Sequence, residues 1–133
     1  MSSFIITFDG GSKGNPGPAY GSFHIQPWTG KSGVTERLQF GAGTNNEAEY
    51  LSLIASLRFL LAFLAGQGQD PGETTVEIRG DSQLVLRQVK KQWKAKDKRM
   101  RALRDEVLQL LDRFERVVVT EQPREKIVER LGH

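Results

Sequence analysis

The chain has 133 residues, 26% charged and 38% hydrophobic, and this length and composition predict one compact domain covering residues 1–133. It contains no cysteine, which excludes disulfides, thiolate metal sites and a cysteine nucleophile, and we expect the cytoplasm as its compartment. The formal net charge is only +3, so the distribution of the charge is more informative than its total.

The first third of the chain predicts an antiparallel meander. Three segments rich in β-branched and aromatic residues predict strands, at 3–8, 19–27 and 34–41. We expect the first strand to end before Asp9 and to run into the glycine- and proline-rich loop 10–18. The segment Thr29-Gly30-Lys31-Ser32-Gly33 predicts the hairpin between the second and third strands.

A helix is predicted from Glu47 to about Ala65, where leucine and alanine are dense, with an asparagine cap in the preceding Thr44-Asn45-Asn46. Hydrophobic residues occupy most of its circumference, so we expect it to be largely buried. Its most hydrophobic part, 51–65, is shorter than the roughly 20 residues of a membrane span. We therefore expect a core helix and no membrane contact.

The second half of the chain predicts two strands and three helices. The strands are expected at 74–79 and 116–120, and the helices over about ten residues from Gly80-Asp81-Ser82, at 98–114 and from Pro123. A right-handed crossover places strand 74–79 parallel to strand 3–8 and close to it. The expected fold class is therefore α/β, a five-stranded mixed sheet that combines the antiparallel meander with parallel strands and is flanked by helices.

Positive charge is concentrated in one short segment. Residues 90–104 carry a formal charge of +7, and the remainder of the chain carries −4. Trp93 lies inside this segment among lysines. A basic segment with an aromatic residue, attached to an acidic body, indicates contact with a polyanion through one surface, and a solvated helix face is the alternative.

Two aspartates directly follow the first and fourth predicted strands. Asp9 and Asp81 are expected at the carboxyl ends of neighbouring parallel strands, the edge at which α/β sheets bind ligands. Carboxylates at that separation repel, and a hard cation such as Mg²⁺ offsets the repulsion. Each residue alone has a plainer explanation, since Asp9 could be a turn residue and Asp81 a helix N-cap.

A third acid is expected from the first turn of the helix that begins at Glu47. Both Glu47 and Glu49 lie there. Residues two apart on a helix point roughly 200° from each other, so only one of the two glutamates can face the aspartates.

Three segments of the chain together resemble one known family. FDGGSKGNPGPAYG at 8–21, GTNNEAEY at 43–50 and GDSQLV at 80–85 look like the signature segments of type 1 ribonuclease H, in the same order and with compatible spacing. The predicted strand and helix order is compatible with a ribonuclease H-like fold over nearly the whole chain. The likeness is to short bacterial and archaeal members, in which a segment like 90–97 replaces a longer basic protrusion.

The resemblance implies an endonuclease that hydrolyses the RNA strand of an RNA/DNA hybrid and leaves 5′-phosphate and 3′-hydroxyl ends. It implies two Mg²⁺ ions, with Mn²⁺ as a substitute, held by Asp9, Glu49 and Asp81. Asp9 would contact both ions, Asp81 the ion that positions the attacking water, and Glu49 the other. We expect the hybrid duplex as the partner and a monomer as the active form.

The resemblance also implies contacts in the minor groove of the hybrid. The matching residues are Gly10, Gly11, Ser12, Asn15, Thr44, Asn45 and Asn46. In the family, the first glycine segment and the catalytic glutamate, here Glu49, contact the 2′-hydroxyl, which only RNA carries. Asn45 and Asn46 match residues that touch both strands. Asn15 and Thr44 match residues that form a pocket for a DNA phosphate.

The basic segment matches the part of the family that contacts the DNA strand. Trp93 resembles the aromatic residue that packs on a deoxyribose, and a core tryptophan is the alternative. Lys94 and Lys96 would contact phosphates and supply affinity that is independent of sequence and falls with salt.

The chain departs from the family at its last helix, where a fourth metal-binding aspartate is usual. Pro123 begins the matching motif, but Ile127 stands at its asparagine position and Leu131 at its aspartate position. His133 could substitute, Glu129 could substitute, or the site could have three acids; we favour His133, because imidazole is an acceptable ligand. The missing aspartate also motivates an alternative function, a hybrid-binding module with little or no cleavage.

Overall fold

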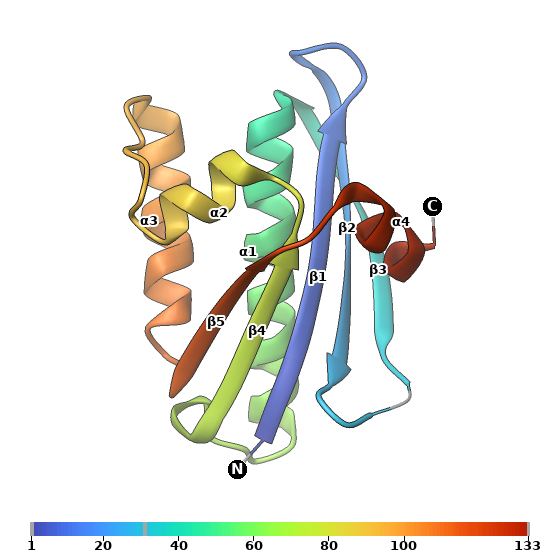
Figure 1. The fold of residues 1–133 in the computed structure, drawn as a ribbon, viewed down its shortest axis with the longest axis vertical. Coiled ribbons are helices and arrows are strands. Elements are labelled where there is room, and N and C mark those ends of the chain that lie inside the picture. Colours follow the sequence, from blue (N-terminus) through green and yellow to red (C-terminus); the bar gives the residue numbers. More distant parts are fainter. Residues whose placement is uncertain (1, 31, 133) are drawn as a thin grey trace.

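Figure 1 shows the computed structural model, which describes residues 2–30 and 32–132. The strands are β1 (Ser2–Ser12), β2 (Gly17–Pro27), β3 (Val34–Gly43), β4 (Thr74–Gly80) and β5 (Arg116–Glu121). The helices are α1 (Asn45–Gly66), α2 (Gln83–Val89), α3 (Lys98–Leu111) and α4 (Arg124–Leu131), with a 3-10 turn at Pro71–Glu73. The predicted α/β class and the order of the elements are confirmed.

The five strands form one mixed sheet in the order β3-β2-β1-β4-β5. β1, β2 and β3 are antiparallel neighbours, as the meander predicted, and β4 pairs with β1 in parallel, as the crossover predicted. β5 is parallel to β4 and forms one edge of the sheet. β1 is therefore the central strand, with an antiparallel neighbour on one side and a parallel neighbour on the other.

β1 is longer than predicted. It pairs with β2 from Phe4 to Ser12, so Asp9 lies inside a strand, opposite Ser22. The prediction of a loop from residue 10 is therefore wrong, because residues 10–12 still belong to the strand. The glycines look like turn residues in the sequence, but here the backbone pairing with β2 continues through them. β4 pairs with β1 only as far as Thr7. Beyond Thr7, one side of β1 has no neighbouring strand.

α1 is the core helix, as predicted. It packs across β1 and β2 on one face of the sheet, and α3 packs beside it. By length and hydropathy alone α1 could span a membrane, but most of its hydrophobic stretch is buried in the fold. Its largest fully buried side chains are Tyr50, Leu53, Leu57, Leu60 and Leu64. Burial on two sides explains why its hydrophobic residues are not confined to one stripe.

α4 lies on the opposite face of the sheet, against β1 and β2 (Figure 1). Ile127 and Leu131 are buried on its inner side and anchor it there. These are the two positions at which the family motif carries asparagine and aspartate. Their hydrophobic side chains hold the helix in place, so neither can supply a fourth ligand.

One helix ends where predicted and one ends earlier. α2 covers Gln83–Val89 and ends close to the predicted position, and Lys91 after it adopts a left-handed backbone with φ 62°. Residues 90–94 are exposed, so no packing holds further turns in the helix. α3 ends at Leu111, and Phe114 packs into the core from the turn that follows it.

Candidate active site

Asp9, Glu49 and Asp81 converge at one place. Each residue offers a carboxylate oxygen, and these oxygens all lie within 4.8 Å of one another. Asp9 comes from the middle of β1, Glu49 from the first turns of α1, and Asp81 from the residue after β4. Asp9 and Glu49 are buried, and Asp81 is partly exposed at the mouth of the cluster. The predicted convergence is confirmed.

The cluster forms where β1 and β4 part. β4 ends at Gly80, so Asp81 leaves the sheet beside the unpaired side of β1, next to Asp9. The cap of α2 is Ser82, whose side chain accepts a hydrogen bond of 3.3 Å from the Val85 backbone N–H. The explanation of Asp81 as a helix N-cap is therefore wrong, and its carboxylate is available to the cluster.

Two glycines allow α1 to reach this site. Gly10 of β1 lies opposite Gly21 of β2, directly beneath the start of the helix. A Cβ atom on Gly10 would lie 2.4–2.6 Å from backbone atoms of Ala48 and Glu49. A Cβ atom on Gly21 would lie 1.8 Å from the Ser52 hydroxyl oxygen. The absence of side chains at this pair lets the helix backbone approach the sheet and carries Glu49 to the aspartates.

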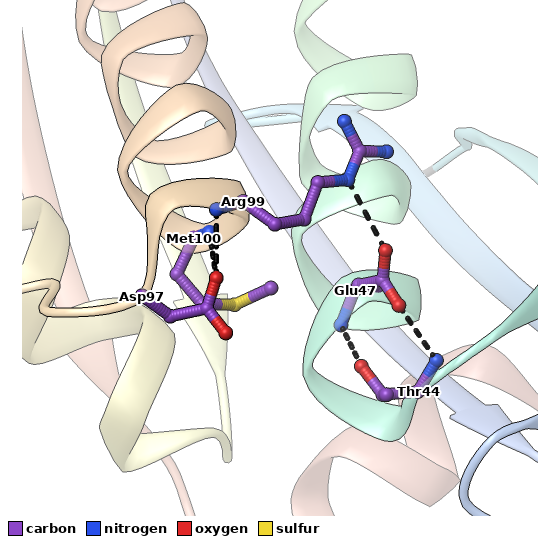
Figure 2. A network of polar contacts seen from close by, with 5 residues as sticks. All are labelled: Thr44, Glu47, Asp97, Arg99 and Met100. Carbon is purple, nitrogen blue, oxygen red and sulfur yellow. Dashed lines mark hydrogen bonds and ion pairs between the residues drawn. The ribbon is translucent and has the colours of Figure 1, made fainter.

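Glu47 points away from the cluster, so only one of the two glutamates faces the aspartates, as the helical spacing predicted, and it is Glu49, as the family resemblance implied. Figure 2 shows its carboxylate accepting a hydrogen bond from the Thr44 backbone N–H, at 3.0 Å, and pairing with Arg99 of α3, at 3.1 Å. The Thr44 hydroxyl in turn accepts from the Glu47 N–H, which completes a capping box. The cap is thus threonine, and the predicted asparagine cap is wrong. The hydrogen bond from the Thr44 backbone has the largest effect in lowering the pKa of Glu47, and the interaction with Arg99 lowers it further.

Glu49 is the least compensated of the three acids. Burial raises the pKa of its carboxyl well above the usual range, and the charges of Asp9 and Asp81 raise it further, while a hydrogen bond from the Gly10 backbone opposes them. Its Oε2 atom is buried without a hydrogen-bond partner among the described residues. A buried oxygen of this kind, beside two more carboxylates, fits a hard divalent cation as its missing partner.

Arg124 is a member of the site that the sequence analysis missed. Its Nη1 donates to Asp9 Oδ2 at 2.6 Å and to Asp81 Oδ2 at 3.3 Å. The guanidinium comes from the first residue of α4, on the other face of the sheet from α1. The Pro-Arg-Glu segment was recognised as part of a motif, and its arginine, next to a strand end, was the available signal.

The structure brings no fourth acid into the cluster among residues 2–30 and 32–132. His133 lies outside the described residues, so its proposed role stays a prediction. Glu129 is exposed on α4 and lines a separate hollow of about 360 Å³ with Thr7 and Arg79. The described part of the site therefore consists of three carboxylates and one guanidinium.

The residues predicted to contact the minor groove lie where β1 ends and α1 begins. Asn45 Oδ1 accepts a hydrogen bond of 2.8 Å from the Ser12 backbone N–H, and Asn15 Oδ1 accepts one of 3.0 Å from the Asn45 backbone N–H. These bonds join the β1–β2 hairpin to the helix start. Asn15, Asn45 and Asn46 are exposed, and Thr44 is partly buried as the helix cap.

The basic segment presents its side chains to solvent. Trp93 is 42% exposed, with the Arg87 guanidinium 5.2 Å from its ring centre, so the alternative of a core tryptophan is wrong. Lys94 and Lys96 are exposed on either side of buried Ala95, which anchors the segment in the core. This part of the segment therefore combines an anchored backbone with exposed lysines and an accessible aromatic face.

This chain is similar in sequence to known proteins over most of its length. Residues 8–129 match the family model described as reverse transcriptase-like. The Ribonuclease HI of Halobacterium salinarum is 37% identical over 117 residues, 88% of this chain and 55% of that protein. The Bifunctional protein Rv2228c of Mycobacterium tuberculosis is 34% identical, over 85% of this chain and 29% of that protein. The chain thus spans about half of the first relative's length and less than a third of the second's.

Solved structures are similar over almost the whole chain. The crystal structure of RNase H1 from Halobacterium salinarum has a TM-score of 0.85 at 35% identity and covers 96% of this chain and 90% of that one. The structure of LC11-RNase H1 in complex with an RNA/DNA hybrid has a TM-score of 0.85 at 32% identity, with the same coverage. The fold, and not only the signature segments, is shared with these proteins.

Proposed function

This chain belongs to the ribonuclease H family, and on that premise we propose that it is a metal-dependent endonuclease that hydrolyses the RNA strand of RNA/DNA hybrids. The observation that carries the proposal is the meeting of Asp9, Glu49 and Asp81, with a buried Glu49 oxygen that lacks a partner. A similar protein, LC11-RNase H1, has been solved in complex with an RNA/DNA hybrid.

The three carboxylates would hold two Mg²⁺ ions, with Mn²⁺ as a substitute. On the pattern of the ribonuclease H family, Asp9 would contact both ions, and its carboxylate lies within 4.8 Å of those of Glu49 and Asp81. Glu49 would hold one ion and Asp81 the other. When bound, such ions stabilise the entering and departing oxygens of an in-line phosphoryl displacement. The expected products carry 5′-phosphate and 3′-hydroxyl ends.

The chain's own groups would select RNA at the cleavage site. The backbone of Gly10, Gly11 and Ser12 borders the cluster, and the Glu49 carboxylate lies beside Gly10. A ribose placed there offers its 2′-hydroxyl to these groups, and a deoxyribose offers none. Asn45 is oriented by its bond to Ser12, so the helix start and the strand end form one recognition surface.

The DNA strand would lie along the exposed residues of the basic segment. Trp93 offers a ring face for a deoxyribose, and Lys94 and Lys96 offer charges for phosphates. Asn15 and Thr44, which are joined through the Asn45 backbone, would bind a further DNA phosphate. Contacts of this kind carry affinity without sequence preference.

Replacement of both Lys94 and Lys96 by alanine should weaken hybrid binding at low salt and reduce its salt dependence. Each phosphate contact adds about 1 to the slope of log K against log salt, so the double variant should lose about 2. Fluorescence anisotropy with a labelled hybrid and no divalent metal measures this. Arg113→Ala, which removes an exposed charge near the end of α3, is the matched control and should leave the slope unchanged.

The proposed activity is tested by incubating the protein with labelled RNA/DNA hybrid and Mg²⁺ or Mn²⁺. We expect cleavage of the RNA strand alone, loss of cleavage in EDTA, and no cleavage of double-stranded DNA. The pairing of Arg124 with two of the three acids, and the lack of a fourth acid among the described residues, favour the hybrid-binding module as the second candidate. Binding without cleavage at every metal concentration would support the module and contradict the enzyme.

We also propose that the protein acts as a monomer in the cytoplasm. All three acids of the cluster and all the proposed substrate contacts come from a single chain, which supports the monomer. The absence of cysteine supports a reducing compartment. Sedimentation velocity of the protein bound to a hybrid too short for two proteins tests the first point, with a complex of one protein and one duplex as the expected result.

A further inference from the structure

The guanidinium of Arg124 occupies the mouth of the acidic cluster. One nitrogen, Nη1, bonds both Asp9 Oδ2 and Asp81 Oδ2, at 2.6 and 3.3 Å, so a single positive charge is shared between the two aspartates. The Arg124 side chain is 56% exposed, whereas that of Asp9 is only 7% exposed. The arginine thus approaches the buried carboxylate from solvent, at the end of a flexible side chain.

We propose that Arg124 is the counter-cation of the metal-free cluster, and that a divalent ion must displace its guanidinium to bind. This proposal rests on the proposed function, because it takes the cluster to be a metal site. Asp9 and Asp81 are the ligands that both cations need. In the absence of metal, the guanidinium limits the repulsion between the aspartates. Metal binding would release it to solvent.

Two observations indicate that displacement is feasible. The guanidinium is largely exposed and regains water when it leaves, while the buried Asp9 carboxylate exchanges one cation for another and is not left uncompensated. The buried Glu49 Oε2 has no bond to Arg124 and no other partner among the described residues. A divalent metal ion can therefore use a ligand oxygen that the arginine does not use. Its charge of +2 is also attracted to the three carboxylates more strongly than the single charge of the guanidinium.

Arg124→Gln, which keeps much of the length of the side chain and removes its charge, separates this role from a structural one. Isothermal titration with Mg²⁺ in the absence of nucleic acid should give a Kd about three- to tenfold lower than that of the unaltered protein. In EDTA at pH 8 the same variant should melt about 3–6 °C lower, because the acids lose their counter-charge. Lys126→Gln removes a charge from the same helix and should change the Kd less than about twofold.

A second measurement needs no variant. In the unaltered protein, the side-chain N–H resonance of Arg124 should move towards the position of a solvated guanidinium as Mg²⁺ saturates the site. An unchanged resonance at saturation, or an equal or higher Kd for Arg124→Gln, would mean that the guanidinium and the metal coexist, and would overturn the inference while leaving the proposed function intact. Absence of Mg²⁺ binding in every variant, together with absence of cleavage, would overturn both.

Discussion

Replacing either Asp9 or Asp81 by asparagine should reduce cleavage of an RNA/DNA hybrid by about a hundred- to a thousandfold, because removal of one group that supports charge stabilisation in the transition state costs about that much. Asparagine has nearly the same shape as aspartate, so the fold should persist. In Asp9→Asn one source of repulsion against buried Glu49 also disappears. The measurement is single-turnover cleavage with saturating protein, beside circular dichroism and thermal melting.

Asp105→Asn is the matched control for this prediction. Asp105 is exposed on α3, where it pairs with neighbouring Arg104, and it lies outside the acidic cluster. Its variant should cleave at the normal rate. Near-normal cleavage by Asp9→Asn or by Asp81→Asn would refute the assignment of the cluster as the metal site, whichever residue completes it.

Gly10→Ala should both destabilise the protein and abolish its activity. The added methyl group would lie within 2.4–2.6 Å of the backbone of Ala48 and Glu49, and backbone atoms cannot move aside as a flexible side chain can. Overpacking of this kind costs about 1–3 kcal/mol of unfolding free energy. To relieve the overlap α1 must move away from β1, which withdraws Glu49 from the aspartates. Urea unfolding and the cleavage assay measure the two effects.

Gly66→Ala separates this steric effect from the general effect of adding a methyl group. Gly66 is the last residue of the same helix, and a Cβ atom there would meet nothing within 4 Å. The substitution should stabilise the protein by about 0.4–1 kcal/mol, through helix propensity and the entropy of the unfolded chain. A Gly10→Ala variant with the unfolding midpoint and activity of the unaltered protein would show that α1 does not need its close approach to β1.

Strands and helices agree with the predictions where one residue pattern determines one local structure. Alternating β-branched residues located the strands, and the dense leucines of 47–65 located the buried helix. The separation of Glu47 from Glu49 also follows from helix geometry alone, because two residues correspond to more than half a turn. The structure places Glu47 in the capping box and Glu49 in the cluster.

Predictions were wrong where a local signal had two meanings. Gly10 and Gly11 are common in turns, yet here they continue β1, because α1 needs a surface without side chains. Threonine and asparagine are both good N-caps, and only the reciprocal bond with Glu47 selects Thr44. Arg124 belongs to a recognised motif at a helix start, but that local signal does not identify its ion-pair partners, which lie 115 and 43 positions away.

The sequence by itself determined the order of strands and helices, the hydrophobic surfaces they bury, and the identity of three acids whose spacing matches a known family. Those features depend on neighbours along the chain, where periodicity and propensity act. Only the tertiary structure decided that the acids share a site whose fourth member is a guanidinium from the opposite face of the sheet. Such a contact depends on where the pairing of β4 with β1 ends and on the packing of Ile127 and Leu131, which holds α4 against the sheet. Both result from packing between segments that are distant in the sequence.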